Sequence, residues 1–222
     1  MADSLHPLGA RTAGVAVFGV SLAALLVPAV GLSPWLVAVP SALAVVAITL
    51  DAARFGGRGG QLLAEALPGG EGRLRRIAVH EAGHALLAEA ESLPVRRVLV
   101  GSLACLRAGL AANGSTEFEP PATARLPLEE LRRWSRVLQA GMVAEQLLYG
   151  ESFGGADDRA LLGRLWGISG HDVGTAQREQ RQARREVLQR LRRDRQALET
   201  RAAALLATAP RLGRSVGASE AA

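Results

Sequence analysis

Two apolar runs near the N-terminus constrain the fold of this chain most. Residues 13–32 contain no charged side chain, and a second apolar run covers residues 35–50. The first run is about as long as the roughly 20 residues that a helix needs to cross a bilayer. Ser33 and Pro34 between the runs suit the start of a new helix, because serine caps helices and proline fits a first turn. We therefore expect a transmembrane helical hairpin over residues 13–50.

The charges that flank the apolar runs predict the orientation of the hairpin. Five arginines follow the second run: Arg54, Arg58, Arg73, Arg75 and Arg76. The positive-inside rule then places the C-terminal part, and the tail of residues 1–12, on the cytoplasmic side. A cleaved signal peptide is the competing interpretation of the first run. The second apolar run behind it and the lack of a clear small-residue cleavage site speak against removal.

The remainder of the chain is predicted to be mainly helical, with a small β element. Gly- and Pro-containing stretches mark residues 51–72 as a flexible linker, and residues 73–212 form the expected domain before a disordered tail of residues 213–222. The apolar spacing and the breaks between segments predict the following elements: helices over 73–91, 126–148, 157–166 and 175–207, a Val-rich strand over 95–101, and a loop over 111–121.

Composition excludes several classes of function. The chain contains no lysine, so a P-loop nucleotide site, which needs its lysine at the phosphates, is impossible in this sequence. Cys105 is the only cysteine, which excludes an intrachain disulfide and a CxxC motif; we expect it to be a small buried apolar residue. The basic excess lies in one C-terminal helical stretch without interleaved aromatic residues, so we predict no nucleic-acid binding.

The segment 80–84, HEAGH, carries the clearest chemical signal. Two histidines four residues apart on a helix project from one face, so His80 and His84 can reach the same zinc ion. Glu81 beside the first histidine is placed to act as general base toward a zinc-activated water. The competing interpretation is a helix with two surface or core histidines. The apolar residues around the motif form an amphipathic helix, which favours the metal site.

A catalytic zinc needs a third protein ligand, and the pattern alone leaves its identity open. His6 precedes the apolar runs, and His171 lies in a glycine-rich break where a loop or capping role is more common. Asp157 and Asp158 open a predicted helix, where acidic residues usually cap the helix and complement its dipole. We expect the small residues of the HEAGH segment to leave space for another element that supplies this ligand.

Three blocks of sequence resemble the peptidase domain of the FtsH family, the membrane-bound ATP-dependent zinc proteases of peptidase family M41. The segment 80–85 is similar to the HEAGHA metal helix of that family. The segment 140–150 is similar to its GGRxAEExxFG helix and turn, with Met142 and Gln146 in place of Arg and Glu. The segment 154–158 falls where the family has GASND. The resemblance covers about residues 73–212 and is weak over 103–121, the region of the family's edge strand near bound substrate.

The resemblance implies that the final aspartate of the third block, Asp158, is the third zinc ligand, with an uncertainty of one residue toward Asp157. It implies an FtsH-like helical peptidase domain with zinc as cofactor. The family places an ATPase domain between membrane and peptidase, whereas here only residues 51–72 intervene. We therefore expect a membrane-anchored, ATP-independent zinc metalloendopeptidase that hydrolyses unfolded or short polypeptides.

Two other functions remain open. A protein that keeps the peptidase fold with little or no turnover would act as an assembly partner or adaptor of FtsH-type proteases; the intact set of His80, Glu81, His84 and Asp158 speaks against it. An intramembrane metalloprotease is disfavoured, because the motif lies well beyond the apolar runs on a helix bounded by charged residues. The Arg-rich C-terminal helix is predicted to pack on the domain or to form a homo-oligomer.

Overall fold

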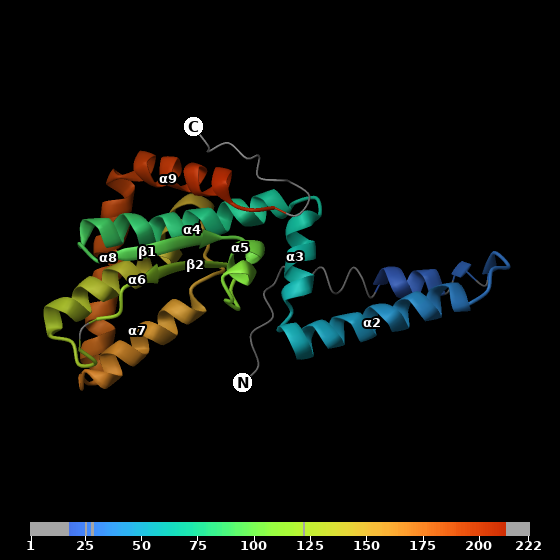
Figure 1. The fold of residues 1–222 in the computed structure, drawn as a ribbon, viewed down its shortest axis with the longest axis horizontal. Coiled ribbons are helices and arrows are strands. Elements are labelled where there is room, and N and C mark those ends of the chain that lie inside the picture. The colour runs from blue at the N-terminus through green and yellow to red at the C-terminus, as the bar shows by residue number, and fades with distance from the viewer. Residues whose placement is uncertain (1–17, 25, 28, 122, 212–222) are drawn as a thin grey trace. The chain divides into compact units, whose positions relative to one another are not determined.

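The computed structural model describes residues 18–24, 26–27, 29–121 and 123–211. In this part of the chain helices dominate, and one two-stranded antiparallel sheet supplies the β structure (Figure 1). The predicted fold class, mainly helical with an N-terminal apolar helix and a small β element, is confirmed. The predicted tails, residues 1–12 and 213–222, lie outside the described residues. The contacts divide the chain into two units, which separate between Gly60 and Gln61.

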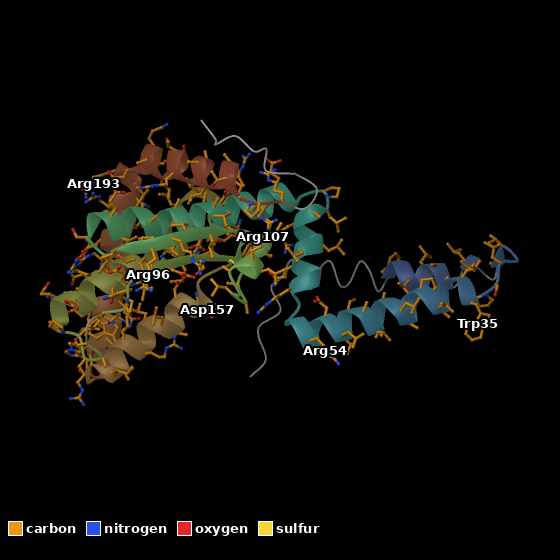
Figure 2. All side chains as sticks on the ribbon, viewed as in Figure 1. Trp35, Arg54, Arg96, Arg107, Asp157 and Arg193 are labelled. Carbon is orange, nitrogen blue, oxygen red and sulfur yellow. The ribbon has the colours of Figure 1, made fainter. Side chains whose placement is uncertain are left out.

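The N-terminal unit contains the apolar helix α2 (Trp35–Phe55). Its segment Trp35–Arg54 has a mean hydropathy of 2.0, and none of it is buried. Figure 2 shows side chains projecting along this helix between Trp35 and Arg54. At 1.5 Å per residue such a helix is about 30 Å long, which matches the hydrocarbon core of a bilayer. Length and composition therefore suit a membrane-spanning helix.

The first apolar run is helical wherever it is described before residue 30. Residues 18–24, 26–27 and 29 have helical backbone, and a turn at residues 30–31 precedes α2. The other residues of the run between 13 and 29 lie outside the described part of the chain. The second helix of the expected hairpin is thus described in full and the first in part.

The expected linker, residues 51–72, is helical over most of its length. Helix α2 continues to Phe55, α3 covers Arg58–Ala66, and α4 begins at Gly70. The carboxylate of Asp51 accepts hydrogen bonds from the amides of Gly59 and Gly60, each at 2.8 Å, and so satisfies free donors in the first turn of α3. The glycine content of this segment predicted irregular backbone. It could not show that Asp51 caps a helix that starts at these glycines. The role of the segment as a linker between domains stays a prediction.

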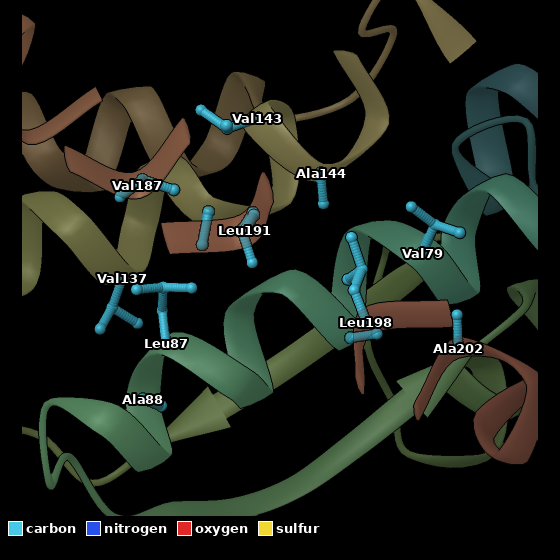
Figure 3. Packing of buried hydrophobic residues seen from close by; sticks show 12 residues of the cluster. Val79, Leu87, Ala88, Val137, Val143, Ala144, Val187, Leu191, Leu198 and Ala202 are labelled. Atoms are coloured by element: carbon cyan, nitrogen blue, oxygen red, sulfur yellow. The ribbon is translucent and has the colours of Figure 1, made fainter. Parts of the chain in front are cut away.

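Four helices build the main core of the C-terminal unit. Helix α4 (Gly70–Ala90) packs against α6 (Leu128–Tyr149) and α9 (Arg195–Thr208), and α6 packs in turn against α8 (Val173–Arg193). Small and aliphatic side chains fill the space between them (Figure 3). The buried members of this cluster are Val79, Ala82, Leu87, Ala88, Val137, Ala140, Val143, Ala144, Val187, Leu191, Leu198 and Ala202. Because so many of them are alanine or valine, the helix axes approach closely.

A second apolar cluster fixes α7 (Ala156–Ile168) to α6. Trp134 and Trp166 lie at its centre, at 4 % and 2 % exposure. The indole nitrogen of Trp166 donates to the hydroxyl of Ser135 at 3.0 Å, and that hydroxyl donates to the carbonyl of Leu131. This pairing satisfies the polar atoms of the buried tryptophan. The cluster fixes α7, whose first turn carries Asp157 and Asp158, against α6.

The sheet consists of β1 (Val95–Val100) and β2 (Gly114–Phe118), joined through the short helix α5 (Ser102–Arg107). Both strands contact α4. The strand over 95–101 was predicted, whereas the loop predicted over 111–121 contains β2, and α5 was not predicted. Cys105 in α5 is fully buried, as expected.

The long helix predicted over residues 175–207 is in fact two helices. Helix α8 ends and α9 begins at Asp194, which Arg190 contacts through an ion pair. The bend lets α8 pack on α6 while α9 covers α4, so that Leu191 and Leu198 enter one core. A straight helix could not follow both partners. The sequence has no proline or glycine at this point that would break a helix, so the bend results from tertiary packing.

Leu198 tests the contribution of α9 to the core, because its side chain has 0 % exposure. We expect Leu198→Ala to lower the free energy of unfolding by about 2–5 kcal/mol through lost burial and the cavity left behind. Ile168→Ala is the matched control, since Ile168 is 52 % exposed and its truncation is expected to cost less than about 0.5 kcal/mol. Thermal and denaturant unfolding measure both; equal losses would contradict the packing described.

Candidate metal centre

Three side chains from two helices converge on one point of the C-terminal unit. His80 and His84 project from adjacent turns of α4, and Asp158 lies in the first turn of α7. Asp158 Oδ2 is 3.2 Å from His80 Nε2 and 3.3 Å from His84 Nε2. The three potential ligand atoms all lie within 4.8 Å of one another. The structure thus brings together the two histidines of the HEAGH segment and the aspartate assigned from the resemblance.

The backbone of α6 fixes the orientation of His84. Its Nδ1 donates a hydrogen bond to the carbonyl oxygen of Val137 at 2.8 Å, in a fully buried setting. A carbonyl oxygen only accepts hydrogen bonds, so Nδ1 carries the hydrogen. The lone pair of a neutral His84 is therefore on Nε2, the atom that faces Asp158. This is the tautomer that a metal ligand requires.

A carboxylate fixes the orientation of His80 in the same way. Nδ1 of His80 lies 2.6 Å from Oε1 of Glu145, a residue of α6 with 2 % exposure. The other oxygen, Oε2, accepts a hydrogen bond from the amide of Phe153 at 3.1 Å. Burial raises the pKa of Glu145, but the hydrogen bonds with His80 and with the amide of Phe153 outweigh burial and lower that pKa. The sequence alone did not suggest this role for Glu145; its signal is an acidic residue between Val143-Ala144 and Leu147-Leu148, on the apolar face of a helix.

Arg76 completes the surroundings of Glu145. It lies one turn before His80 on α4, and its Nη1 is 3.6 Å from Glu145 Oε2. Its guanidinium stacks over the rings of Tyr149 and Phe153, at 4.6 Å and 4.2 Å from the ring centroids. Aromatic faces attract a guanidinium and restrict its rotamers. The cation that balances Glu145 is thereby held in a defined place.

The electrostatics of the three convergent side chains favour a bound cation. Burial lowers the pKa of His80, but its bonds with Asp158 and Glu145 outweigh burial and raise that pKa to about 10. Burial raises the pKa of Asp158, but the two histidines outweigh it and hold that pKa well below its usual range. Two imidazole nitrogens and one carboxylate oxygen are a common protein donor set of catalytic zinc. The residues present therefore fit a zinc ion.

Glu81 lies next to the first histidine but outside the group of three potential ligands. Its side chain is buried, and its Oε2 accepts a hydrogen bond from the hydroxyl of Thr116 on β2 at 2.7 Å. Burial raises the pKa of Glu81, and the charges of His84 and His80 oppose that rise. A carboxyl group with a raised pKa beside a cation site is suited to accept a proton and to return it.

The close approach of α4 and α6 rests on one glycine in each helix. A Cβ on Gly83 would lie 2.7 Å from the carbonyl oxygen of Ala140, and one on Gly141 would overlap Nε2 of His80 and lie 2.6 Å from His84 Nε2. The small residues of the HEAGH segment were expected to make room for the element that supplies the third ligand. That expectation is wrong, because α6 occupies the space and contributes the outer partners Glu145 and Val137.

The other candidate ligands lie elsewhere or outside the described residues. Asp157 is exposed and does not belong to the group, although it directly precedes Asp158. His171 packs against the ring of Trp166, with centroids 5.3 Å apart. His6 lies outside the described residues.

Comparison with known proteins finds one partial similarity. The chain is 40 % identical over 86 residues to the ATP-dependent zinc metalloprotease FtsH of Methylococcus capsulatus. The matched region is 37 % of this chain and 13 % of that protein, so the chain contains an FtsH-related region and spans a small part of the relative's length. No family profile matches the chain, and no solved structure matches it.

Gly141 tests whether the helix approach is required for the site. We expect Gly141→Ala to weaken zinc binding at least about tenfold and to lower stability by about 1–3 kcal/mol, because the new Cβ forces the histidines or the helices apart. Zinc titration and thermal unfolding measure the two effects.

Gly163→Ala on α7 is the control for this substitution, because a Cβ at Gly163 meets nothing within 4 Å. It exchanges a helical glycine for alanine, which is expected to be neutral or to stabilise by up to about 1 kcal/mol. Unchanged zinc affinity in Gly141→Ala would show that the approach of α6 is not needed.

Proposed function

We propose that this chain is a membrane-anchored zinc metalloendopeptidase that hydrolyses unfolded or short polypeptides without ATP. The observation that carries the proposal is the convergence of His80 Nε2, His84 Nε2 and Asp158 Oδ2 beside the buried carboxyl group of Glu81. Three protein ligands with an adjacent carboxylate are the arrangement of a zinc hydrolase. The partial similarity to FtsH, which is named a zinc metalloprotease, supports the same chemistry.

In the proposed mechanism His80, His84 and Asp158 would hold the metal through Nε2 of each histidine and Oδ2 of the aspartate. When bound, zinc supplies a Lewis acid that activates water and polarises the scissile carbonyl group. Glu81 takes the proton of the attacking water on its carboxylate and delivers it to the leaving amine. Glu145 and the Val137 carbonyl keep both imidazoles in the ligating orientation throughout the cycle.

The proposed absence of ATP dependence and the membrane anchor rest on other parts of the chain. The 222 residues contain no lysine, so no P-loop of the standard type is available to unfold substrates. The apolar helix α2 has the length and composition of a membrane span, and arginines follow it on the proposed cytoplasmic side. Suitable substrates would be polypeptides that reach the site without being unfolded by an ATPase. The protease itself would act as a homo-oligomer or beside an FtsH-type partner.

Removal of the proposed general base tests turnover. The full chain in detergent with zinc is expected to cleave casein or a quenched peptide without ATP. Glu81→Gln is expected to lower kcat by at least about a hundredfold while zinc stays bound, because the amide cannot accept the proton. Zinc content and cleavage rate are measured on the same preparations.

The two outcomes of the Glu81 experiment separate the candidate functions. Cleavage that survives in Glu81→Gln at the wild-type rate would refute the mechanism. A wild-type chain that binds zinc stoichiometrically but cleaves no polypeptide would favour the assembly partner or adaptor over the peptidase.

The neighbouring aspartates provide a matched test of the third ligand. Asp158→Asn is expected to reduce bound zinc well below one equivalent, since the neutral amide is a poor ligand. Asp157→Asn is expected to retain zinc, because Asp157 is exposed and outside the convergent group. Metal content after dialysis decides between them; zinc kept by Asp158→Asn and lost by Asp157→Asn would reverse the assignment.

A further inference from the structure

The strand β2 lies against the side chain of Glu81. Gly114, Thr116 and Phe118 occupy alternate positions and therefore share one face of the strand. A Cβ on Gly114 would lie 2.6 Å from Glu81 Oε1 and 2.5 Å from Ile77 Cγ2, so the strand backbone already touches α4. Only a glycine permits this approach. The strand is thereby close enough for its next inward residue to reach the carboxyl group.

That next residue is Thr116. Its hydroxyl donates to Oε2 of Glu81 at 2.7 Å. Within the described part of the chain, no other side chain donates a hydrogen bond to Glu81. A glutamate side chain has three rotatable bonds, and a single strong bond to a β-branched residue with few rotamers removes much of that freedom. Thr116 is thus the contact best suited to set the direction of the carboxyl group.

The strand itself is firmly placed. The backbone of Thr116 is paired with Val98 of β1. Two residues further on, the ring of Phe118 lies edge to face with Trp134 and His84, at centroid distances of 5.5 Å and 6.2 Å. Phe118 packs against both apolar clusters. Thr116 therefore donates from a rigid support, which is what holding a reacting group within a narrow range of geometry requires.

We propose that Thr116 is a positioning residue that holds the Glu81 carboxyl group in place for proton transfer, with Gly114 allowing β2 to come close enough. This inference rests on the proposed peptidase function for its effect on turnover. The hydrogen bond itself is independent of that function. Thr116 acts through Glu81 and contacts none of the three potential metal ligands in the described hydrogen bonds.

Matched substitutions at two adjacent residues separate positioning from folding. Thr116→Val keeps the branched shape and removes the hydroxyl, Thr116→Ser keeps the hydroxyl, and Ser115→Ala changes the neighbouring residue on the opposite face of β2. We expect kcat to fall about tenfold or more in Thr116→Val, with unchanged KM and zinc content and with a thermal unfolding that is lowered but still cooperative. Thr116→Ser is expected to restore most of kcat, and Ser115→Ala to leave it unchanged.

A second readout does not depend on turnover. In the full chain with ¹³C-labelled glutamate, the carboxyl signal of Glu81 is assigned by its loss in Glu81→Gln. We expect this signal to shift in Thr116→Val and to stay near its wild-type position in Thr116→Ser and Ser115→Ala. If the wild type cleaves no polypeptide, the proposed function fails, and the carboxyl signal alone decides whether Thr116 holds Glu81.

Three results would overturn the proposal. One is wild-type turnover in Thr116→Val. Another is a Glu81 carboxyl signal that stays in place in that variant. The third is loss of zinc or of folded protein together with activity in Thr116→Val, which would assign Thr116 a structural role.

Discussion

The contact between α4 and α6 at Gly83 and Gly141 is the constraint on which the rest of the site depends. Both glycines are needed because the opposing helix leaves no room for a Cβ. Because the helices are close, the Val137 carbonyl oxygen and the Glu145 carboxylate of α6 come within hydrogen-bond distance of the histidines of α4. Each imidazole is then held at Nδ1 and presents Nε2 to Asp158. A helix pair at ordinary separation would leave both rings free to rotate.

Negative and positive side chains alternate around this contact. Asp158 and Glu145 lie on opposite sides of His80, and Arg76 lies behind Glu145, between two aromatic rings. Burying two carboxylates near one imidazole is costly unless positive charge is close to both. Arg76 supplies it for Glu145. A metal cation at the convergence point of the two histidines and Asp158 would do so for Asp158, and its binding would then stabilise this region.

Local patterns in the sequence were sufficient for helices α4, α6 and α7 and for the two histidines. Helical spacing located α4, α6 and α7 to within a few residues, and the stripe of Leu131, Trp134 and Leu138 is buried as expected. The spacing of His80 and His84 predicted a shared face. Asp158 was predicted as a ligand only from the resemblance, because an aspartate at the start of a helix usually caps the helix or complements its dipole. The bend at Asp194, the strand β2 and the roles of Glu145 and Thr116 depend on which elements meet in three dimensions, and no local pattern encodes that.

Glu65 gives the segment after α2 a direct connection to the site. The carboxylate of Glu65 in α3 accepts hydrogen bonds from the amide and the hydroxyl of Ser102, and that hydroxyl is hydrogen bonded to the side-chain amide of Asn113 at 3.0 Å. Asn113 directly precedes Gly114, whose backbone touches Glu81. Two hydrogen bonds and one peptide bond therefore join Glu65 of α3 to the strand that carries Thr116, so the position of β2 beside Glu81 depends on where α3 is held.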